Sequence, residues 1–343
     1  MSFPAQPELV TTEWLSKALN RPIESFRVEF FGEGAGIIGQ VTRVHITTAQ
    51  GEESIIAKFP SPSADNRGVA AMYDMYGREV NFYRHIARSI TLRVPICYHS
   101  EYDPETLDFV LLMEDLADMR IGDQVLGCSE ADARLVVEGI ARLAASSWNT
   151  PADLVSHNNP GQRDGMIGGF KQGWPVVQEM FAHLIPANAN NIGEQVPNAV
   201  PGLLERLCTP PMTISHADVR LDNIFFGADE IALVDWQSVC RSAPEQDLAY
   251  FVTQSLSREV RATTDWVALY HEHLTGLGVS NYSLAQCRER YAIAALYLIC
   301  YATIISGTLD LANERGRALG ETLFGNAMRS LDELDAFSLL EEF

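Results

Sequence analysis

The sequence lacks the features of several protein classes. None of its six cysteines forms a C-x-x-C pair, which argues against a zinc site or a disulfide framework and favours reduced thiols. Residues 1–10 have neither the basic start nor the apolar run of a signal peptide. The one long apolar stretch, residues 292–305, is shorter than the roughly 20 residues of a membrane helix and is flanked by Arg290 and Asp310. We therefore expect a cytoplasmic protein without a membrane partner, in which this stretch is a buried core helix.

Basic residues are scarce as well. The chain has 25 Lys and Arg against 45 Asp and Glu, which gives a formal charge of −20. An acidic surface repels phosphate-rich polymers, so no nucleic-acid partner is expected, whereas a cationic substrate would be tolerated. The same acidity can also serve solubility alone. We expect a monomer or weak dimer that acts on a small molecule.

The pattern of residue types changes near residue 116. Short β-branched and aromatic runs dominate before that point, and helical periodicity dominates after it. A chain of 343 residues is too long for one ordinary core, so we predict an α+β fold with a small antiparallel β lobe, residues 1–116, and a larger helical lobe, residues 117–343. Strands are expected at 28–31, 40–48, 54–59, 96–102 and 109–113, and helices at 12–19, 69–89, 132–148, 169–184, 243–257, 264–277 and 284–308. Residues 213–236 are expected to form a strand, a loop and a strand, and the Asn- and Pro-rich residues 186–201 to form a loop.

The most specific pattern is the segment I-S-H-A-D-V-R-L-D-N, residues 214–223, which we call the catalytic loop. It places Asp218 two residues after His216 and five before Asn223, and an apolar strand ending in Asp235 follows. Transfer of a phosphoryl group from ATP needs a carboxylate for the acceptor hydroxyl, here Asp218, and oxygen ligands for Mg²⁺, here Asn223 and Asp235. These roles come from the protein-kinase template. A single loop Asp or Asn is usually a turn residue, so it is the joint spacing that favours a phosphotransfer site.

The N-terminal part contains the other half of a nucleotide site. Lys58 ends the apolar run I-I-A-K, like the strand lysine that pairs with the α- and β-phosphates, and Glu79 on the next predicted helix can pair with it. Residues 32–39 are glycine-rich, and Gly34 and Gly36 would let backbone N–H groups approach phosphates. No G-K-[ST] follows, so this is not a Walker A loop.

The predicted strand at residues 109–113 leads into the segment that joins the two lobes. Backbone groups of Glu114 and Leu116 there could hydrogen-bond the adenine edge, with Met113 packed behind it. An ordinary strand end is the alternative interpretation of the same residues.

Together these residues resemble the aminoglycoside phosphotransferase and choline kinase-like superfamily, from about residue 30 to 255. The R-L-D-N of residues 220–223 is similar to kinase-like domains attached to some acyl-CoA dehydrogenases. The D-W-Q of residues 235–237 and the D-L-A-Y-F of residues 247–251 are similar to that branch and to the ecdysteroid kinase-like branch. The usual Gly between the His and the catalytic Asp is Ala217 here. The resemblance implies a protein kinase-like two-lobed fold that uses ATP and Mg²⁺.

The resemblance also suggests roles for two further residues. Asp247 would cap or tie down the catalytic loop. Arg220 would either contact the transferring phosphoryl group or pair with a neighbouring carboxylate.

Only eight residues separate Asp235 from Pro244, which leaves no room for the activation segment of a protein kinase. In this superfamily an insertion like residues 153–207 shapes the acceptor pocket, and Trp174, Phe181 and His183 either line it or belong to the core.

We therefore expect an ATP-dependent phosphotransferase acting on a hydroxyl of a small molecule. The alternatives are an inactive kinase-like nucleotide-binding module and a scaffold protein. An amine acceptor would need acidic groups such as Asp164, Glu179, Glu272 or the tail at 332–342. A sterol or hydroxyacyl compound would need an apolar cleft, and the branch resemblance favours this second class.

Overall fold

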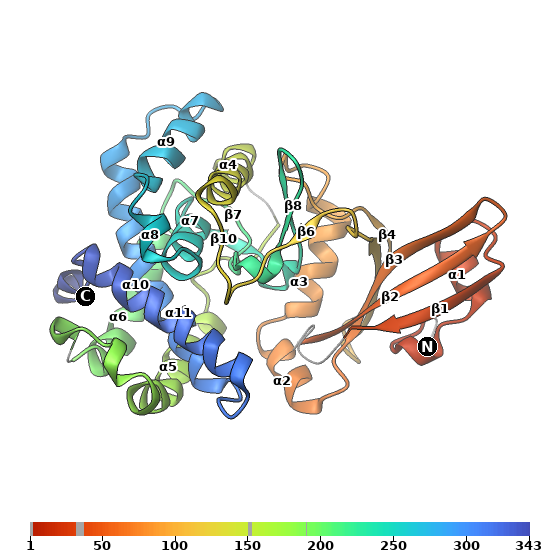
Figure 1. The fold of residues 1–343 in the computed structure, drawn as a ribbon, viewed down its shortest axis with the longest axis horizontal. Helices are drawn as coiled ribbons and strands as arrows, with labels where there is room; N and C mark the ends of the chain where they lie inside the picture. The colour runs from red at the N-terminus through yellow and green to blue at the C-terminus, as the bar shows by residue number, and fades with distance from the viewer. Residues whose placement is uncertain (1–2, 32–37, 150–152, 190) are drawn as a thin grey trace. The chain divides into compact units, whose positions relative to one another are not determined.

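The computed structural model describes residues 3–31, 38–149, 153–189 and 191–343, and the chain forms two compact units (Figure 1). Unit 1 comprises Met1–Ser89, Arg93–Met119 and Val234–Ser238, and unit 2 comprises Ile90–Leu92, Arg120–Leu233 and Val239–Phe343. The main boundary thus lies three residues after the predicted one. The Val234–Ser238 segment, predicted for the second lobe, belongs to unit 1 because its side chains pack there.

Unit 1 is built on a five-stranded antiparallel sheet with the strand order β1-β2-β3-β5-β4. The strands are β1 (Ser25–Phe30), β2 (Gly39–Thr48), β3 (Gly51–Pro60), β4 (Cys97–Asp103) and β5 (Asp108–Glu114). Each predicted strand of this lobe corresponds to one of these five. In the central register, Lys58 of β3 is paired with Val41 of β2 on one side and with Leu111 of β5 on the other.

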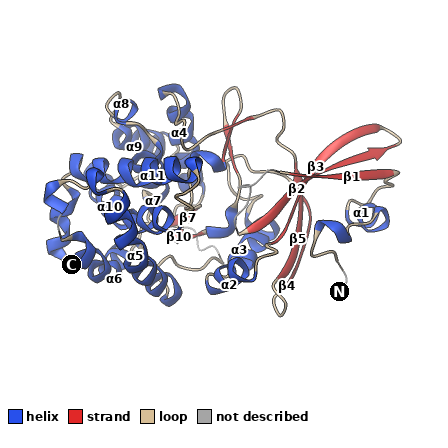
Figure 2. Cartoon of the chain, turned by 60° about the horizontal axis from the view of Figure 1, so that its bottom comes forward, coloured by secondary structure: helices blue, strands red, loops and turns tan. Residues whose placement is uncertain are grey.

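The two faces of this sheet bury different sets of side chains, because successive residues of a strand point to opposite faces. On one face, Ile55, Ala57 and Phe59 of β3 pack with Leu15 of α1 (Thr12–Ala18). On the other, Phe109 of β5 contacts Tyr76 with ring centroids 4.6 Å apart. Tyr76 belongs to α3, and Figure 2 shows α1 and α3 on opposite sides of the sheet. Lys58 lies one residue out of step with Ala57 and therefore faces α3.

The single helix predicted at residues 69–89 is in fact interrupted. It consists of α2 (Ala64–Met72), α3 (Met75–Asn81) and a π-helical turn, Phe82–Ile86. The break falls at Asp74, whose φ of 51° is left-handed. Asp tolerates this conformation better than most residues, and periodicity alone does not reveal it.

Unit 2 is mostly helical, with two small antiparallel sheets. Its helices are α4 (Glu130–Ser146), α5 (Pro160–Met180), α6 (Ile192–Leu207), α7 (Gln246–Tyr250), α8 (Arg258–Arg261), α9 (Trp266–Gly276), α10 (Leu284–Thr308) and α11 (Glu314–Glu333). One sheet has the order β6-β8-β9 and the other pairs β10 with β7. These strands are β6 (Arg120–Ile121), β7 (Thr213–Ser215), β8 (Ile224–Phe226), β9 (Ile231–Leu233) and β10 (Cys240–Ser242).

Helix α10 forms the centre of unit 2 and packs against α5, α6, α7, α9 and α11 (Figure 1). Its bounds are those predicted, and Ser283 with Gln286 forms a capping box at its start. By length and composition this helix could cross a membrane, but 67% of its most apolar window is buried within the protein. It is packed as a core helix.

The loop predicted at residues 186–201 is wrong from Ile192 onward, where α6 begins. Pro197 and Pro201 lie inside this helix, and each interior proline costs about 3 kcal/mol. Four fully buried side chains recur at helical spacing and each contributes about 1.5–3 kcal/mol: Val196, Val200, Leu203 and Leu204. The apolar face therefore outweighs the two prolines.

Helices α5 and α10 approach closely through glycines. A Cβ atom on Gly173 would lie 2.6 Å from the main-chain oxygen of Thr303, and one on Gly307 would lie 2.5 Å from Cα of Gly173. Neither backbone could remain in place if a side chain were added. By contrast, a Cβ on Gly168, also in α5, would meet nothing within 4 Å.

We predict that Gly173→Ala lowers the free energy of unfolding by about 1–3 kcal/mol through overpacking. Gly168→Ala is the matched control and should raise it by about 0.5–1 kcal/mol, because alanine is the better helix residue. Urea unfolding followed by circular dichroism measures both. Equal effects of the two substitutions would contradict the close glycine contact.

Candidate functional site

In unit 1 the central feature is a buried lysine shared by two carboxylates. Nζ of Lys58 lies 2.7 Å from Oε2 of Glu79 and 2.6 Å from Oδ1 of Asp235. Lys58 is 4% exposed and Glu79 is 1% exposed. The predicted pairing of the strand lysine with the helix glutamate is thus present, and it includes the predicted metal ligand Asp235.

The electrostatics of this group follow from its burial and its composition. Burial alone would lower the pKa of Lys58, but the carboxylates of Asp235 and Glu79 outweigh it and the pKa is raised. Burial raises the pKa of Glu79, and the attraction of Lys58 opposes this. Within the described part of the chain, this group contains one cation and two carboxylates, and such a balance favours a further cation.

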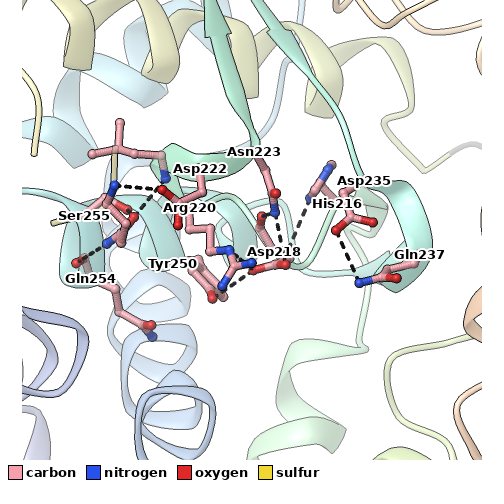
Figure 3. Close-up of polar contacts among 12 residues, drawn as sticks. His216, Asp218, Arg220, Asp222, Asn223, Asp235, Gln237, Tyr250, Gln254 and Ser255 are labelled. Atoms are coloured by element: carbon pink, nitrogen blue, oxygen red, sulfur yellow. Dashed lines mark hydrogen bonds and ion pairs between the residues drawn. The ribbon is translucent and has the colours of Figure 1, made fainter. Parts of the chain in front are cut away.

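Aromatic stacking holds Asp235 in unit 1. Trp236, which is fully buried, stacks on Phe82 with ring centroids 3.9 Å apart and an interplanar angle of 8°. Asp235 itself is left-handed, with a φ of 66°, and its Oδ2 accepts a hydrogen bond of 3.3 Å from Nε2 of Gln237 (Figure 3). Strain of this kind is typical of functional positions.

In the predicted adenine-binding segment, the side chain of Glu114 is paired with Arg93. Glu114 accepts two hydrogen bonds from Arg93, of 2.9 and 2.6 Å, and Arg93 lowers the pKa of this carboxyl group. The main-chain N–H of Glu114 donates to the carbonyl of Ile96 at 2.8 Å, so this N–H is already used within the protein. Met113 and Leu116 are buried at 7% and 3% exposure.

Gly34 and Gly36 lie outside the described residues. The end of their glycine-rich segment is described at Ile38, whose carbonyl accepts a hydrogen bond of 2.6 Å from the hydroxyl of Tyr76. The N–H of Ser61 donates to the same hydroxyl at 3.0 Å. Tyr76 thereby fixes the end of this segment to the region after β3.

In unit 2 the catalytic loop is held by the buried carboxylate of Asp247. It accepts a hydrogen bond of 2.7 Å from Oγ of Ser215, one of 2.8 Å from the N–H of His216 and one of 2.9 Å from the N–H of Ala217. The three donors are consecutive and immediately precede Asp218. The role inferred for Asp247 from the family resemblance, tying down the loop, is therefore confirmed.

Ala217 occupies a backbone conformation that suits glycine. Its φ is 62°, in the left-handed region, where a Cβ atom costs roughly 1–2 kcal/mol. The hydrogen bonds from the N–H groups of His216 and Ala217 to Asp247 hold the loop at this conformation.

The carboxylate of Asp218 has hydrogen-bond donors at both oxygens (Figure 3). Nδ2 of Asn223 lies 3.1 Å from Oδ2, and also donates to the Asp218 carbonyl at 2.9 Å. The hydroxyl of Tyr250 donates to Oδ1 at 3.0 Å. Nε of Arg220 is 3.9 Å from Oδ1, a loose ion pair with a neighbouring carboxylate. The predicted contact of Arg220 with a phosphoryl group stays a prediction.

His216, predicted among the catalytic residues, lies beside the backbone of Asp218. It is fully buried, and its Nδ1 accepts a hydrogen bond of 3.3 Å from the main-chain N–H of Asp218. The ring thus contacts the backbone of the residue it precedes in the loop, and its predicted catalytic role stays a prediction.

Two residues of this site were missed in the sequence. Tyr250 lies within the D-L-A-Y-F motif, which was the available signal. Gln124 is fully buried, and its Oε1 accepts a hydrogen bond of 2.8 Å from the N–H of Leu221 while its own N–H donates 3.0 Å to Asp222. It lies almost a hundred residues before the loop, and no local pattern marks it.

Two of the aromatic residues predicted to line an acceptor pocket or belong to the core lie against the same ring: the centroids of Trp174 and Phe181 are 6.4 and 6.2 Å from that of Phe324. Trp174 is half-buried and stacks on Phe170 with centroids 5.6 Å apart, Phe181 is buried, and His183 is exposed, 3.7 Å from Glu321. The acidic candidates are also exposed: Asp164 and Glu179 on α5, and Glu272 on α9.

The sequence pattern of the ecdysteroid kinase-like family matches residues 33–278. The chain belongs to the ecdysteroid kinase-like family. The family name describes a kinase-like group and agrees with the suspected branch. A search of curated proteins found no match.

Solved structures similar to this ecdysteroid kinase-like protein share its fold at low identity. A protein of Ralstonia eutropha JMP134 assigned as an aminoglycoside phosphotransferase is 14% identical, with a TM-score of 0.55 and coverage of 97% of this chain and 98% of that one. A protein of Haemophilus somnus 129PT assigned as a fructosamine-3-kinase is 14% identical, with a TM-score of 0.50 and coverage of 93% and 96%. The aminoglycoside 2′-phosphotransferase IIIa, solved with GDP, is 12% identical, with a TM-score of 0.50 and coverage of 95% and 98%. The predicted fold class is confirmed.

We predict that Asp247→Asn lowers the free energy of unfolding by about 1.5–3 kcal/mol, because an acceptor oxygen becomes an amide group facing hydrogen-bond donors. Asp229→Asn, in the exposed turn after β8, is the matched control and should change it by less than about 0.5 kcal/mol. Denaturant unfolding of both variants is the measurement, and indistinguishable midpoints would refute the clamp.

Proposed function

We propose that this ecdysteroid kinase-like protein is an ATP- and Mg²⁺-dependent phosphotransferase that transfers the γ-phosphate to a hydroxyl of a small molecule. The observation that carries the proposal is Lys58, buried on β3 between Glu79 and Asp235. An ammonium group fixed in this way is the arrangement that protein kinases use to hold the α- and β-phosphates. Bound GDP in a solved structure of similar fold supports nucleotide use.

The donor atoms of Asp235 and Asn223 fit a magnesium ion. Asp235 belongs to a group with more negative than positive charge. The amide nitrogen of Asn223 is engaged by Asp218, which turns the harder ligand, its side-chain oxygen, toward another partner. Hard oxygen donors are those that Mg²⁺ prefers, and a bound Mg²⁺ supplies neutralisation of phosphate charge.

In this proposal Asp218 orients the acceptor hydroxyl and takes its proton, and Arg220 contributes a permanent positive charge beside it. The Asp218 carboxylate is held by hydrogen-bond donors and not by a strong ion pair, since Nε of Arg220 lies 3.9 Å from Oδ1 of Asp218. Lone pairs therefore remain for a hydroxyl group.

The acceptor is proposed to be a small molecule and not a protein. The residues after Asp235 are occupied by a short 3₁₀ turn, Trp236–Ser238, and by β10, which pairs with β7. Helix α7 begins at Gln246, so the residues between Asp235 and Gln246 leave no room for a loop that would bind a peptide substrate. Among small molecules we propose an apolar hydroxylated compound rather than an amine, from the family to which the chain belongs.

We predict that Asp218→Asn lowers kcat by roughly 10²–10⁴-fold, because it removes the base while keeping the shape of the side chain. The measurement is ADP release from Mg²⁺–ATP in the presence of a panel of hydroxylated compounds. Binding of ATP should persist in the variant. Unchanged turnover would refute the role of Asp218, and ATP binding without turnover in the native protein would favour the inactive nucleotide-binding alternative.

We predict that Mg²⁺–ATP raises the melting temperature of the native protein and that Asp235→Asn removes the part of this shift that depends on Mg²⁺. A ligand at a hundred times its Kd stabilises a protein by about 2.7 kcal/mol, which is easily detected. Glu52→Gln, an exposed carboxylate on β3, is the control and should keep the full shift. A full shift in Asp235→Asn would exclude Asp235 as a metal ligand.

A further inference from the structure

Helix α7 contacts the catalytic loop through two side chains that lie three residues apart. Asp247 accepts hydrogen bonds from residues 215–217, as described above. Tyr250 is the other, and its hydroxyl donates to Oδ1 of Asp218 at 3.0 Å (Figure 3). Residues at this spacing share one face of a helix, so a single turn fixes both the backbone of the loop and the carboxylate it presents.

We propose that Tyr250 is a positioning residue for phosphotransfer: its hydroxyl holds one oxygen of the Asp218 carboxylate, so that the acceptor alcohol meets the other lone pairs in a fixed orientation. This inference rests on the proposed function, in which Asp218 is the base.

The chemistry of Tyr250 suits this task. The residue is fully buried, and burial raises its pKa well above the ordinary value, so the phenol stays protonated and remains a donor. A neutral donor orients the carboxylate without adding a further charge beside it. Arg220, at 3.9 Å, is beyond hydrogen-bond distance and orients Oδ1 less strictly.

The helix that carries Tyr250 is itself fixed at its far end. Immediately after α7 the chain forms a π-helical turn, Phe251–Ser255, in which carbonyl groups leave the regular helix pattern. The Gln254 carbonyl accepts hydrogen bonds of 2.8 Å from Gln124 and 3.2 Å from Asn326 of α11. Because Gln124 also binds the N–H of Leu221, the turn and the catalytic loop share one anchor.

A neighbouring tyrosine provides the control. Tyr301 of α10 packs edge-to-face on Tyr250 with ring centroids 5.9 Å apart, but its hydroxyl is engaged by Nε2 of Gln162 at 2.9 Å. Tyr301→Phe therefore perturbs the same packing without removing a bond to Asp218.

The test is a double-mutant cycle on Mg²⁺-dependent ADP release, with Tyr250→Phe and Asp218→Asn alone and combined. Tyr250→Phe should lower kcat about tenfold or more while KM for ATP changes less than twofold, and Tyr301→Phe should change kcat less than twofold. In the Asp218→Asn background Tyr250→Phe should cause no further loss, since its effect passes through that carboxylate.

An equal loss from Tyr250→Phe in both backgrounds, an unchanged kcat, or an equal loss in Tyr301→Phe would overturn the inference. The native protein, the two single variants of the cycle and the double variant are also unfolded in urea. If Asp218→Asn leaves turnover intact, the proposed role of Asp218 as the base fails, and the unfolding cycle then tests the contact between Tyr250 and Asp218 by itself. Coupling of about tenfold in the unfolding constant supports the bond, and additive effects refute it.

Discussion

The catalytic loop depends on one buried carboxylate. Asp247 accepts hydrogen bonds from three consecutive residues, and two of the donors are main-chain N–H groups at the left-handed turn of Ala217. Burial raises the pKa of this carboxyl group, which is the cost of placing it in the interior. Hydrogen bonds to the carboxylate oppose part of that cost, because such bonds are stronger in a medium of low dielectric constant. The orientation of Asp218, and with it any proton transfer, follows from this arrangement.

The buried group around Lys58 in unit 1 differs from the Asp247 site, because it contains ionisable side chains of both signs. Among the residues that the structure describes, Lys58 lies between two carboxylates. Glu79 is as deeply buried as the lysine, whereas the Asp235 side chain is 24% exposed. An arrangement of this kind holds the ammonium group in place through Glu79.

Much of the site could be predicted where the chemistry is local in sequence. Asp218 and Asn223 lie in one short motif, Lys58 ends a strand of obvious apolar pattern, and α10 begins at a Ser-x-x-Gln capping box. Their predicted places in the two units agree with the structure. The roles of Asp218, Asn223 and Asp235 toward a nucleotide stay predictions.

What could not be predicted depends on long-range packing. Gln124 acquires its importance from bonds to residues near 221 and 254, which no periodicity connects. Helix α6 forms despite two prolines because its apolar face is buried by α5 and α10. The break at Asp74 and the π-helical turns are settled by single backbone conformations and by tertiary contacts, and average propensities do not report them.

The chain crosses between the two units more than once, and this affects how the protein can fold during synthesis. Unit 1 recruits Val234–Ser238 from the middle of the sequence, and the chain re-enters unit 2 on either side of that segment. During synthesis, the first 119 residues emerge without the indole that stacks on Phe82 and without one of the two carboxylates beside Lys58. The β-rich unit can therefore complete its interior only after the ribosome has passed residue 238, and a fragment that ends earlier would expose an aromatic face. Dividing this protein into separately expressed halves at the apparent boundary would remove a structural part from each half.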